Sequence, residues 1–402
     1  MKPEEILNKA KAMENEIIEN RRYLHKNAEV DFELDKTGAF IKEWLSELGC
    51  EYSDCGKNGV VCVLGDSSKG KTFMLRADMD ALPVKECADV DFKCANGNMH
   101  ACGHDMHTAM LLGAAKLLKS FENNLNGAVK LMFQPAEETL SGAKNMIENS
   151  VLKNPDVNGA MMLHVMAGLP LKTGTIIVSS EGVGAPAADY FTINIQGKGC
   201  HGSTPQQGID ALIVGAHILI GLQEINSREL GVSDEALITI GSFNGGTAGN
   251  VIADTADLKG TLRAYDDNIR DMIKKRITEI SENIGKAYRA KVCVTFGSGC
   301  PTLYNDGELS ESVEKYAKEI FGDEAVVNTE TIGSRSSRSG GSEDFAYISK
   351  EVPSLMVAIA AGEPEKGYKY PQHHPKVTFD ESVLYKGAAL FSYCAVKWLQ
   401  DN

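Results

Sequence analysis

The stretch that decides the fold is Thr108–Pro135, "TAMLLGAAKLLKSFENNLNGAVKLMFQP". Its first part, "TAMLLGAAKLLKSF", has the length and nearly continuous apolar content of a buried helix, and its last part, "GAVKLMFQP", is a short apolar run typical of a buried strand. Strand-like runs precede it ("VVCVLG" and "TFMLRADMD"), and "SGAKNMIENS" and "GAMMLHV" follow it as a helix and a strand. Strands that alternate with helices predict a mostly parallel sheet covered by helices on both faces.

The two ends of the chain continue this style. Near the N-terminus, the periodicity predicts amphipathic helices over Ile6–Asn27 and Thr37–Gly49. Near the C-terminus it predicts a strand over Pro353–Ala360 and a closing helix over Glu381–Gln400.

The middle of the chain follows a different pattern. Its runs read in order as strand, helix, two strands, helix and strand: "DYFTINIQGKG", "GIDALIVGAHILIGLQEIN", "EALITIGSFNGG", "TADLKGTLRA", "NIRDMIKKRITEISENIGKAY" and "KVCVTFGSG". This β-α-β-β-α-β order is that of a small ferredoxin-like domain. A chain of 402 residues is also too long for one ordinary core. We therefore predict a discontinuous α/β catalytic domain (residues 1–185 and 300–402) with a ferredoxin-like α+β domain (186–299) inserted into it.

Composition excludes some classes of partner. The formal net charge is −14, so the surface repels phosphate backbones and anionic lipid, and neither nucleic acid nor membrane is expected as a partner. A small anionic substrate stays possible, because a metal ion or an arginine can invert the local field. The arginine- and serine-rich run Gly333–Phe345 is for the same reason interpreted as a solvated loop.

The start of the chain, "MKPEEILNKAKAMENEIIEN", is charged throughout, and no apolar run reaches the length of a spanning helix. A cytoplasmic protein is expected, with its ten cysteines reduced. No C-x-x-C pair occurs, which argues against a zinc ribbon or a thioredoxin-like motif.

Polar clusters follow the strands of the predicted catalytic domain. Asp78 and Asp80 end one strand, Glu137 and Glu138 follow another, and His164 stands at the end of a third. In open α/β sheets, ligands bind outside the carboxyl ends of the strands. These clusters and the loop "MHACGHDMH" (Met99–His107) are therefore expected at one edge of the sheet.

The residue types at that edge suit a metal centre. Cys102 and His104 flank Gly103, and a thiolate with an imidazole ligates zinc, cobalt or manganese-like ions. His100 and His107 are alternatives, and His107 also suits an outer role that orients a ligand. Adjacent side chains such as those of Glu137 and Glu138 point in different directions, so one is expected to bind metal and the other to hold a water.

A distant candidate is "YPQHHPKVTFDES", which offers His373 and His374 before Pro375. Adjacent histidines do not easily face one metal, so one of them is expected to be structural.

With these residues in view, the chain resembles the metal-dependent N-acyl-L-amino acid amidohydrolases, the hippurate and auxin-conjugate hydrolase branch of the two-metal aminoacylase and carboxypeptidase superfamily. The matching segments span nearly the whole chain: "RADMDALP", "MHACGHDMHTAMLLGAA", "QPAEE", "LHVMAGLP", "GKGCHGSTPQQGIDA", "GGTAGNVIADTADLKGTLR", "GSEDF" and "HHP". The resemblance implies a zinc-peptidase-like catalytic domain with an inserted lid or dimerisation domain, and hence a homodimer or higher homo-oligomer. The sequence departs from the family pattern at Cys200, Ala253 and Gln372, where glycine, proline and leucine, respectively, are usual.

The resemblance also implies roles for individual residues. The implied metal ligands are Cys102, His104, Glu138, His164 and His373, with Cys102 bridging two ions and His373 preferred because the family motif is His-x-Pro. Glu137 matches the general base, and Asp80 matches an outer carboxylate that orients a ligand. In the inserted domain, His201 matches a residue that polarises the scissile carbonyl, and Asn250 and Arg263 match groups that hold the substrate's carboxylate.

The expected activity is hydrolysis of the amide bond of N-acyl-L-amino acids by two divalent ions (Zn, Mn, Co or Ni), releasing a carboxylic acid and an amino acid. A dipeptidase or aminoacyl carboxypeptidase on the same site is one alternative. A zinc nucleobase deaminase needs H-x-E and P-C-x-x-C, which are missing. A non-catalytic metal-binding protein needs ligands but no spare carboxylate, so Glu137 beside Glu138 is the feature that discriminates against it.

Overall fold

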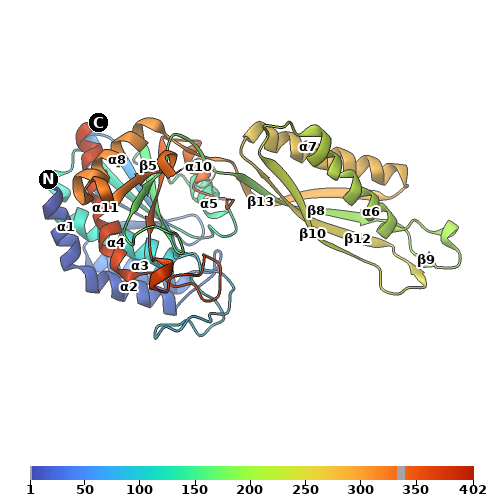
Figure 1. Ribbon diagram of the computed structural model, residues 1–402, viewed down its shortest axis with the longest axis horizontal. Coiled ribbons are helices and arrows are strands. Elements are labelled where there is room, and N and C mark those ends of the chain that lie inside the picture. Colours follow the sequence, from blue (N-terminus) through green and yellow to red (C-terminus); the bar gives the residue numbers. More distant parts are fainter. Residues whose placement is uncertain (1, 333–339) are drawn as a thin grey trace. The chain divides into compact units, whose positions relative to one another are not determined.

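The protein is described from a computed structural model that covers residues 2–332 and 340–402 (Figure 1). The chain divides into two compact units. Unit 1 comprises Met1–Gly184, Tyr304–Arg338 and Asp344–Asn402, and unit 2 comprises Ala185–Leu303 and Ser339–Glu343. Residues 333–339, most of the run predicted as a solvated loop, lie outside the described residues. Among the described helices, none combines the length and apolar character that crossing a bilayer requires.

Unit 1 is built on an eight-stranded sheet with strand order β1-β2-β4-β3-β5-β16-β6-β15. The strands are β1 (Tyr52–Cys55), β2 (Gly59–Gly65), β3 (Thr72–Asp78), β4 (Ala128–Gln134), β5 (Gly159–Met166), β6 (Ile176–Val178), β15 (Val326–Asn328) and β16 (Ser354–Ala360). The pairs β4–β3, β3–β5 and β5–β16 at its centre are parallel, which confirms the predicted sheet. The carboxyl ends of these central strands therefore meet at one edge.

Helices cover both faces of this sheet (Figure 1). They are α1 (Pro3–Ala12), α2 (Glu14–Lys26), α3 (Asp35–Glu47), α4 (His104–Ser120), α5 (Gly142–Glu148), α8 (Gly307–Phe321), α9 (Thr329–Ile332), α10 (Ala346–Ser349) and α11 (Leu384–Asp401). Helices α4 and α11 pack against each other and against β3, while α5 and α10 lie together on the other face, next to β4 and β16. Helix α4 is buried nearly all round, which explains its continuous apolar sequence.

The first helical region differs from its prediction. The single helix expected over Ile6–Asn27 is broken at Met13, whose φ of −97° and ψ of 3° separate α1 from α2. Helix α1 packs against α11 and α2 packs against α4. Each half therefore buries its own apolar side chains, such as Ile6 on α1 and Ile17 on α2, against a different partner.

Unit 2 has the predicted β-α-β-β-α-β order. Its elements are β8 (Ala187–Gln196), α6 (Ala211–Gly221), β10 (Ala236–Gly245), β12 (Thr255–Ala264), α7 (Asp267–Ala287) and β13 (Lys291–Cys300). The strands form an antiparallel sheet in the order β10-β12-β8-β13, and both helices pack on this sheet. The apolar core between the helices and the sheet is separate from the core of unit 1. The short strands β9 (Cys200–His201) and β11 (Val251–Ile252) pair in a ribbon, and β7 (Gly182–Ala185) pairs with β14 (Leu303–Asn305).

Candidate active site

The loop that carries Cys102 and His104 is shaped by the glycine between them. Gly103 has a φ of 93° and stands directly before the first residue of α4. A Cβ at this position would lie 2.4 Å from Cγ2 of Val165 on β5. Only glycine combines this positive φ with so close an approach, so the turn at Gly103 brings Cys102 and His104 over the ends of the central strands.

The glutamate pair follows β4 on a strained turn. Ala136 has a φ of 54°, a conformation that non-glycine residues rarely adopt. The carboxylate of Asp80 holds the turn, because its Oδ1 accepts from the backbone N–H of Glu137 and its Oδ2 from that of Glu138, each at 3.1 Å. Strain of this kind persists only where surrounding contacts enforce it, and it clusters at functional sites.

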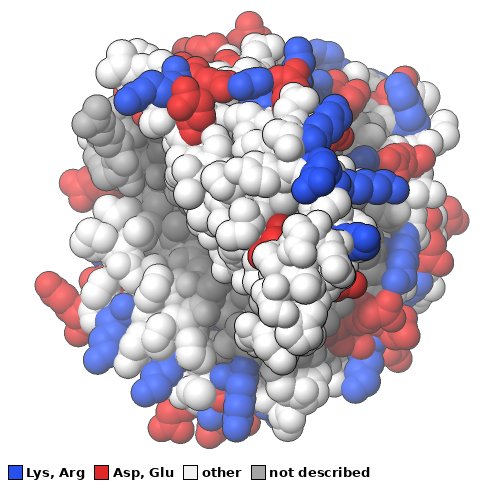
Figure 2. All heavy atoms as spheres, turned by 90° about the vertical axis from the view of Figure 1, so that its right-hand side faces the viewer, with Lys and Arg blue, Asp and Glu red and all other residues white. Residues whose placement is uncertain are grey.

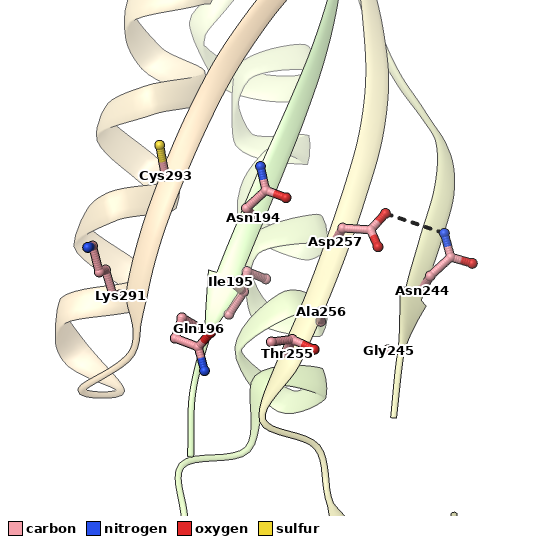
Figure 3. A pocket seen from close by; sticks show the side chains of 10 residues that line it. All are labelled: Asn194, Ile195, Gln196, Asn244, Gly245, Thr255, Ala256, Asp257, Lys291 and Cys293. Atoms are coloured by element: carbon pink, nitrogen blue, oxygen red, sulfur yellow. Dashed lines mark hydrogen bonds between the residues drawn. The ribbon is translucent and has the colours of Figure 1, made fainter. Parts of the chain in front are cut away.

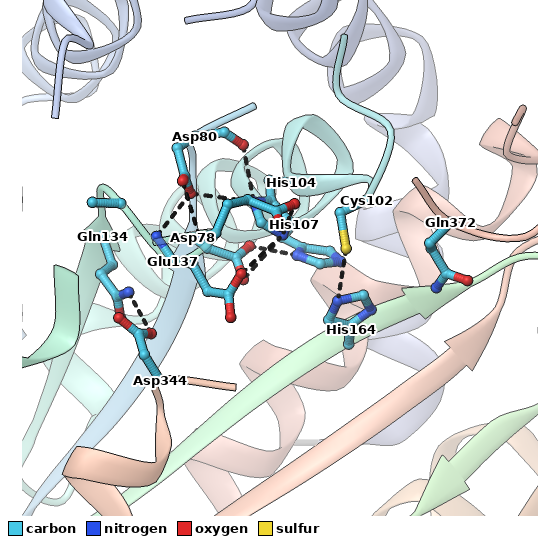
Figure 4. Close-up of polar contacts among 12 residues, drawn as sticks. Asp78, Asp80, Cys102, His104, His107, Gln134, Glu137, His164, Asp344 and Gln372 are labelled. Carbon is cyan, nitrogen blue, oxygen red and sulfur yellow. Dashed lines mark hydrogen bonds and ion pairs between the residues drawn. The ribbon is translucent and has the colours of Figure 1, made fainter. Parts of the chain in front are cut away.

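The side chains from these segments meet in one place (Figure 4). Cys102 Sγ lies 3.6 Å from His164 Nε2, and His373 Nε2 lies 3.5 Å from Glu138 Oε2. His104 Nε2 lies 3.9 Å from an oxygen of each glutamate. Three overlapping groups have potential ligand atoms within 4.8 Å of one another: Cys102, His104 and His164; Cys102, Glu138 and His373; and His104, Glu137 and Glu138.

Two histidines of this cluster have defined tautomers. Nδ1 of His104 donates to the carbonyl oxygen of Asp80 (2.9 Å), and Nδ1 of His164 donates to that of Val165 (2.7 Å). A carbonyl oxygen only accepts, so in each neutral ring the proton is on Nδ1 and the lone pair of Nε2 faces the cluster. Nε2 of His104 is buried and has no hydrogen-bond partner among the described residues.

The pKa shifts follow from burial and from neighbouring charges. Burial, with smaller effects of His107 and other groups, lowers the pKa of His164 to about 3, so this ring is neutral at physiological pH. Burial also raises the pKa of the Cys102 thiol, and the nearby Glu138 carboxylate acts in the same direction. Burial opposes a charge on His104, but the Asp78 carboxylate raises its pKa above the usual value. A bound cation would have to displace these protons from Cys102 and His104.

His107, which sequence analysis left as an alternative ligand, uses both of its ring nitrogens. Its Nε2 accepts from the backbone N–H of Val165 at 2.9 Å, and its Nδ1 donates to Asp78 Oδ1 at 2.5 Å. His100 is buried and does not belong to any of the groups of ligand atoms found among the described residues.

Behind Asp78 lies a buried polar network that sequence reasoning missed. Arg76 on β3 donates to Asp78 Oδ2 (2.7 Å), Gln134 Oε1 (2.9 Å) and Asp344 Oδ1 (2.9 Å). Gln134 also donates to Asp344 at 2.7 Å. The available signal was the arginine in the middle of an otherwise apolar strand, since a charged residue is almost never fully buried unless it is paired.

The two adjacent histidines near the C-terminus differ clearly. His373 has a φ of 65°, and its backbone N–H donates to the carbonyl oxygen of Ala101 at 2.9 Å. His374 instead stacks on Tyr370, with ring centroids 4.4 Å apart, and its Nδ1 accepts from the backbone N–H of Lys376. Only His373 therefore reaches the cluster.

The three candidate residues of unit 2 fall into two places. His201 on β9 and Asn250 lie side by side, because β9 pairs with β11 and the N–H of Gly202 donates to the carbonyl oxygen of Asn250 at 2.8 Å. Arg263 lies near the far end of β12, roughly 26 Å from Thr255 at its start, given the rise of a strand. Within one copy of unit 2, the arginine is thus remote from the other two.

His201 presents a defined ring edge. Its Nδ1 accepts from the backbone N–H of Ser203 at 3.1 Å and lies 2.7 Å from the hydroxyl of the same residue. The neutral ring therefore carries its proton on Nε2. The side chain is exposed, so this N–H can donate to another group.

Unit 2 also has an open pocket of about 440 Å³ on its sheet (Figure 3). Its lining includes Asn194, Gln196, Asp257 and Lys291. None of the site residues predicted from the sequence lines it.

Comparisons with known proteins identify the family of this chain. The sequence matches Peptidase family M20/M25/M40 over residues 74–397. It is 35% identical over 397 residues to the N-acetyl-L-cysteine deacetylase of Bacillus subtilis, covering 97% of this chain and 89% of the relative. It is also 35% identical over 402 residues to thermostable carboxypeptidase 2 of Saccharolobus solfataricus, covering 98% of each.

A solved structure shares the fold as well. The Bacillus subtilis YXEP protein, described as a dinuclear metal binding peptidase from the M20 family, superposes with a TM-score of 0.78 at 31% identity. The match covers 97% of this chain and 99% of that one. The chain therefore belongs to Peptidase family M20/M25/M40.

Proposed function

We propose that this protein hydrolyses the amide bond of N-acyl-L-amino acids with two divalent metal ions. The observation that carries the proposal is the position of Glu137, a buried carboxylate that lies beside His104 and Glu138 but is in neither of the groups that contain Cys102. A protein that only stores metal has no need of this group. The deacetylase relative and the family match support the reaction class.

The residues present suit such ions. A cysteine sulfur, three imidazoles and a carboxylate are ligands that zinc, manganese, cobalt and nickel accept. The buried Nε2 of His104 has no hydrogen-bond partner among the described residues, as expected of an atom that binds a cation. We propose that Cys102, His104, Glu138, His164 and His373 would hold the ions, since these five residues make up the two groups of ligand atoms that contain Cys102.

When bound, such ions supply Lewis acidity that polarises the carbonyl and makes a water a better nucleophile near neutral pH. Glu137 takes the proton from the attacking water and delivers it to the departing nitrogen, as a general base and then a general acid. Asp80 keeps this carboxylate in place through the backbone of the turn. The Nε2–H of His201 donates to the oxygen of the scissile carbonyl as negative charge develops on it.

The substrate's carboxylate is assigned to Asn250 and Arg263, since a guanidinium binds a carboxylate with two parallel hydrogen bonds. Asn250 and Arg263 are too far apart in one unit 2 to hold the same carboxylate. We therefore propose that the enzyme is a homodimer in which His201 and Asn250 act on a substrate bound by the other copy.

An apolar surface supports a dimer through unit 2. Leu212, Ile213 and Ile220 on α6 are 37%, 50% and 67% exposed. In the view of Figure 2, uncharged side chains gather in the middle of the face turned toward the viewer. Exposed apolar groups of this kind mark protein interfaces.

All ten cysteines are free thiols, which supports a cytoplasmic location.

A carboxypeptidase or dipeptidase activity at the same site is the second candidate, and the name of the Saccharolobus relative favours it. The two activities share the base, the ions and the carboxylate-binding groups, and differ in what occupies the acyl side.

The test is a metal-supplemented panel of N-acetyl and N-benzoyl amino acids and dipeptides, scored by the free amino acid released. We expect turnover of the N-acyl substrates, and Glu137→Gln is expected to lower kcat by about 10²–10⁴-fold while keeping the bound metal. Turnover of dipeptides alone would favour the second candidate. No turnover by a fully metal-loaded protein would favour storage.

A further inference from the structure

We propose that Gln372 is a positioning residue that ties the His373 loop to the carbonyl oxygen that orients His164. The inference rests on the proposed function, because it concerns two of the proposed metal ligands. Gln372 lies beside His164, with its amide nitrogen turned toward the strand that carries that histidine (Figure 4).

The contact joins segments that are far apart in the chain. Nε2 of Gln372 donates to the carbonyl oxygen of Val165 at 2.9 Å and lies 3.3 Å from Sδ of Met166. Val165 O also accepts from Nδ1 of His164 at 2.7 Å. One backbone oxygen at the end of β5 thus accepts hydrogen bonds from a proposed ligand and from the neighbour of another.

The conformation of His373 explains why such a contact is needed. Its φ of 65° lies in the left-handed region, which a non-glycine residue adopts only where surrounding contacts enforce it. The hydrogen bond from its N–H to Ala101 O and the hydrogen bond from the amide of Gln372 to Val165 O both restrain the chain where it enters His373. The side chain of His373 is 55% exposed, so packing alone does little to fix it.

The arrangement predicts an unequal effect on the two ions. His373 belongs to the group with Cys102 and Glu138, and His164 belongs to the group with Cys102 and His104. Without the amide of Gln372, the His373 loop loses its hydrogen bond to Val165 O and can relax. The hydrogen bond from Nδ1 of His164 to the same oxygen remains. Loss of Gln372 should therefore lower the affinity for the ion that depends on His373 and leave the affinity for the ion that depends on His164 unchanged.

The experiment is a Gln372→Leu variant of the full chain, which keeps a side chain of similar size and removes both N–H donors. Zn²⁺ is titrated into metal-free protein against a chromophoric chelator, and Co²⁺ loading is followed by absorption spectra. We expect the affinity for one ion to fall about 10–100-fold, the usual effect of losing an outer hydrogen bond, while the other ion and the thiolate-to-Co²⁺ band are retained.

The matched control is Gln400→Leu, an exposed glutamine on α11 of the same unit. It should bind both ions as the wild type does. If Gln372→Leu binds both ions with wild-type affinity, the inference about Gln372 is overturned and the proposed function is not. Equal loss of affinity for both ions together with a lower Tm would also overturn the inference, because it indicates a general loss of stability. A wild-type protein that binds no divalent ion would overturn the proposed function as well.

Discussion

Asp80 Oδ1 accepts a hydrogen bond from the backbone N–H of Glu137 at 3.1 Å, so one carboxylate holds the proposed base through its main chain. The other oxygen of Asp80 accepts from Glu138, and its backbone carbonyl accepts from His104. Asp80 is fully buried and reaches the cluster through these contacts. It therefore positions the base and two proposed ligands at once.

Replacing Asp80 with asparagine should disturb the turn that carries Glu137 and Glu138, while the backbone carbonyl that accepts from His104 stays in place. In Asp80→Asn, one of the two backbone N–H groups faces an amide nitrogen instead of an acceptor. We expect metal affinity and kcat/KM each to fall about 10–100-fold. Metal titration and kinetics with an N-acyl substrate measure this. Asp54→Asn, an exposed carboxylate of the same unit, is the control and should change neither.

The proposed dimer makes a prediction about mixtures of inactive variants. If His201 acts on the other copy's substrate, a heterodimer of Glu137→Gln and His201→Gln contains one site with both groups intact. A one-to-one mixture allowed to exchange subunits should then recover about one quarter of wild-type activity, since half of the dimers are mixed and each has one intact site. No recovery, with heterodimers shown to form, would mean that His201 acts within its own chain.

The buried network around Arg76 should matter for stability. Arg76→Met removes the buried guanidinium that pairs with Asp78 and Asp344, and we expect the free energy of unfolding of unit 1 to fall by about 3–5 kcal/mol. Denaturant titration followed by tryptophan fluorescence reports on this unit, because Trp44 and Trp398, the two tryptophans of the chain, both lie in it. An exposed substitution such as Arg22→Met should cost less than about 1 kcal/mol.

His25 should make stability depend on pH. Burial opposes its charge, but hydrogen bonds with Asp105 (2.8 Å) and Glu86 (3.2 Å) raise its pKa above the usual value. Its contribution is therefore full below the unfolded-state pKa of about 6.5 and is lost as pH rises through the folded-state pKa. The stability difference between the wild type and His25→Gln, measured by denaturant titration, should shrink as pH rises above 6.5. A difference that grows with pH would contradict this assignment.

Much of the fold could be predicted because its signals are local. The long helix α7 was expected over Asn268–Tyr288 and spans Asp267–Ala287, since its apolar face repeats with the helical period. Short strands such as β6 and β15 were missed. Each has three residues, and a strand of that length is defined by the neighbour it pairs with rather than by its own pattern.

The candidate site, like the fold, could be predicted from the sequence only in part. Cys102, Glu137 and His164 were expected at one edge because the ends of parallel strands meet there, and the structure brings them together. The choice between His373 and His374 came from family resemblance alone. The structure supplies a physical reason, because stacking on Tyr370 occupies His374.

By itself, the sequence determined the order of strands and helices, the inserted β-α-β-β-α-β pattern and the residue types at the strand ends, since these depend on periodicity and chemical identity along the chain. Only the tertiary structure decided which ring nitrogens face the cluster, how Arg76 is paired and what Gln372 contacts. Hydrogen bonds depend on direction and on distances between atoms that are far apart in the chain, so no local pattern records them.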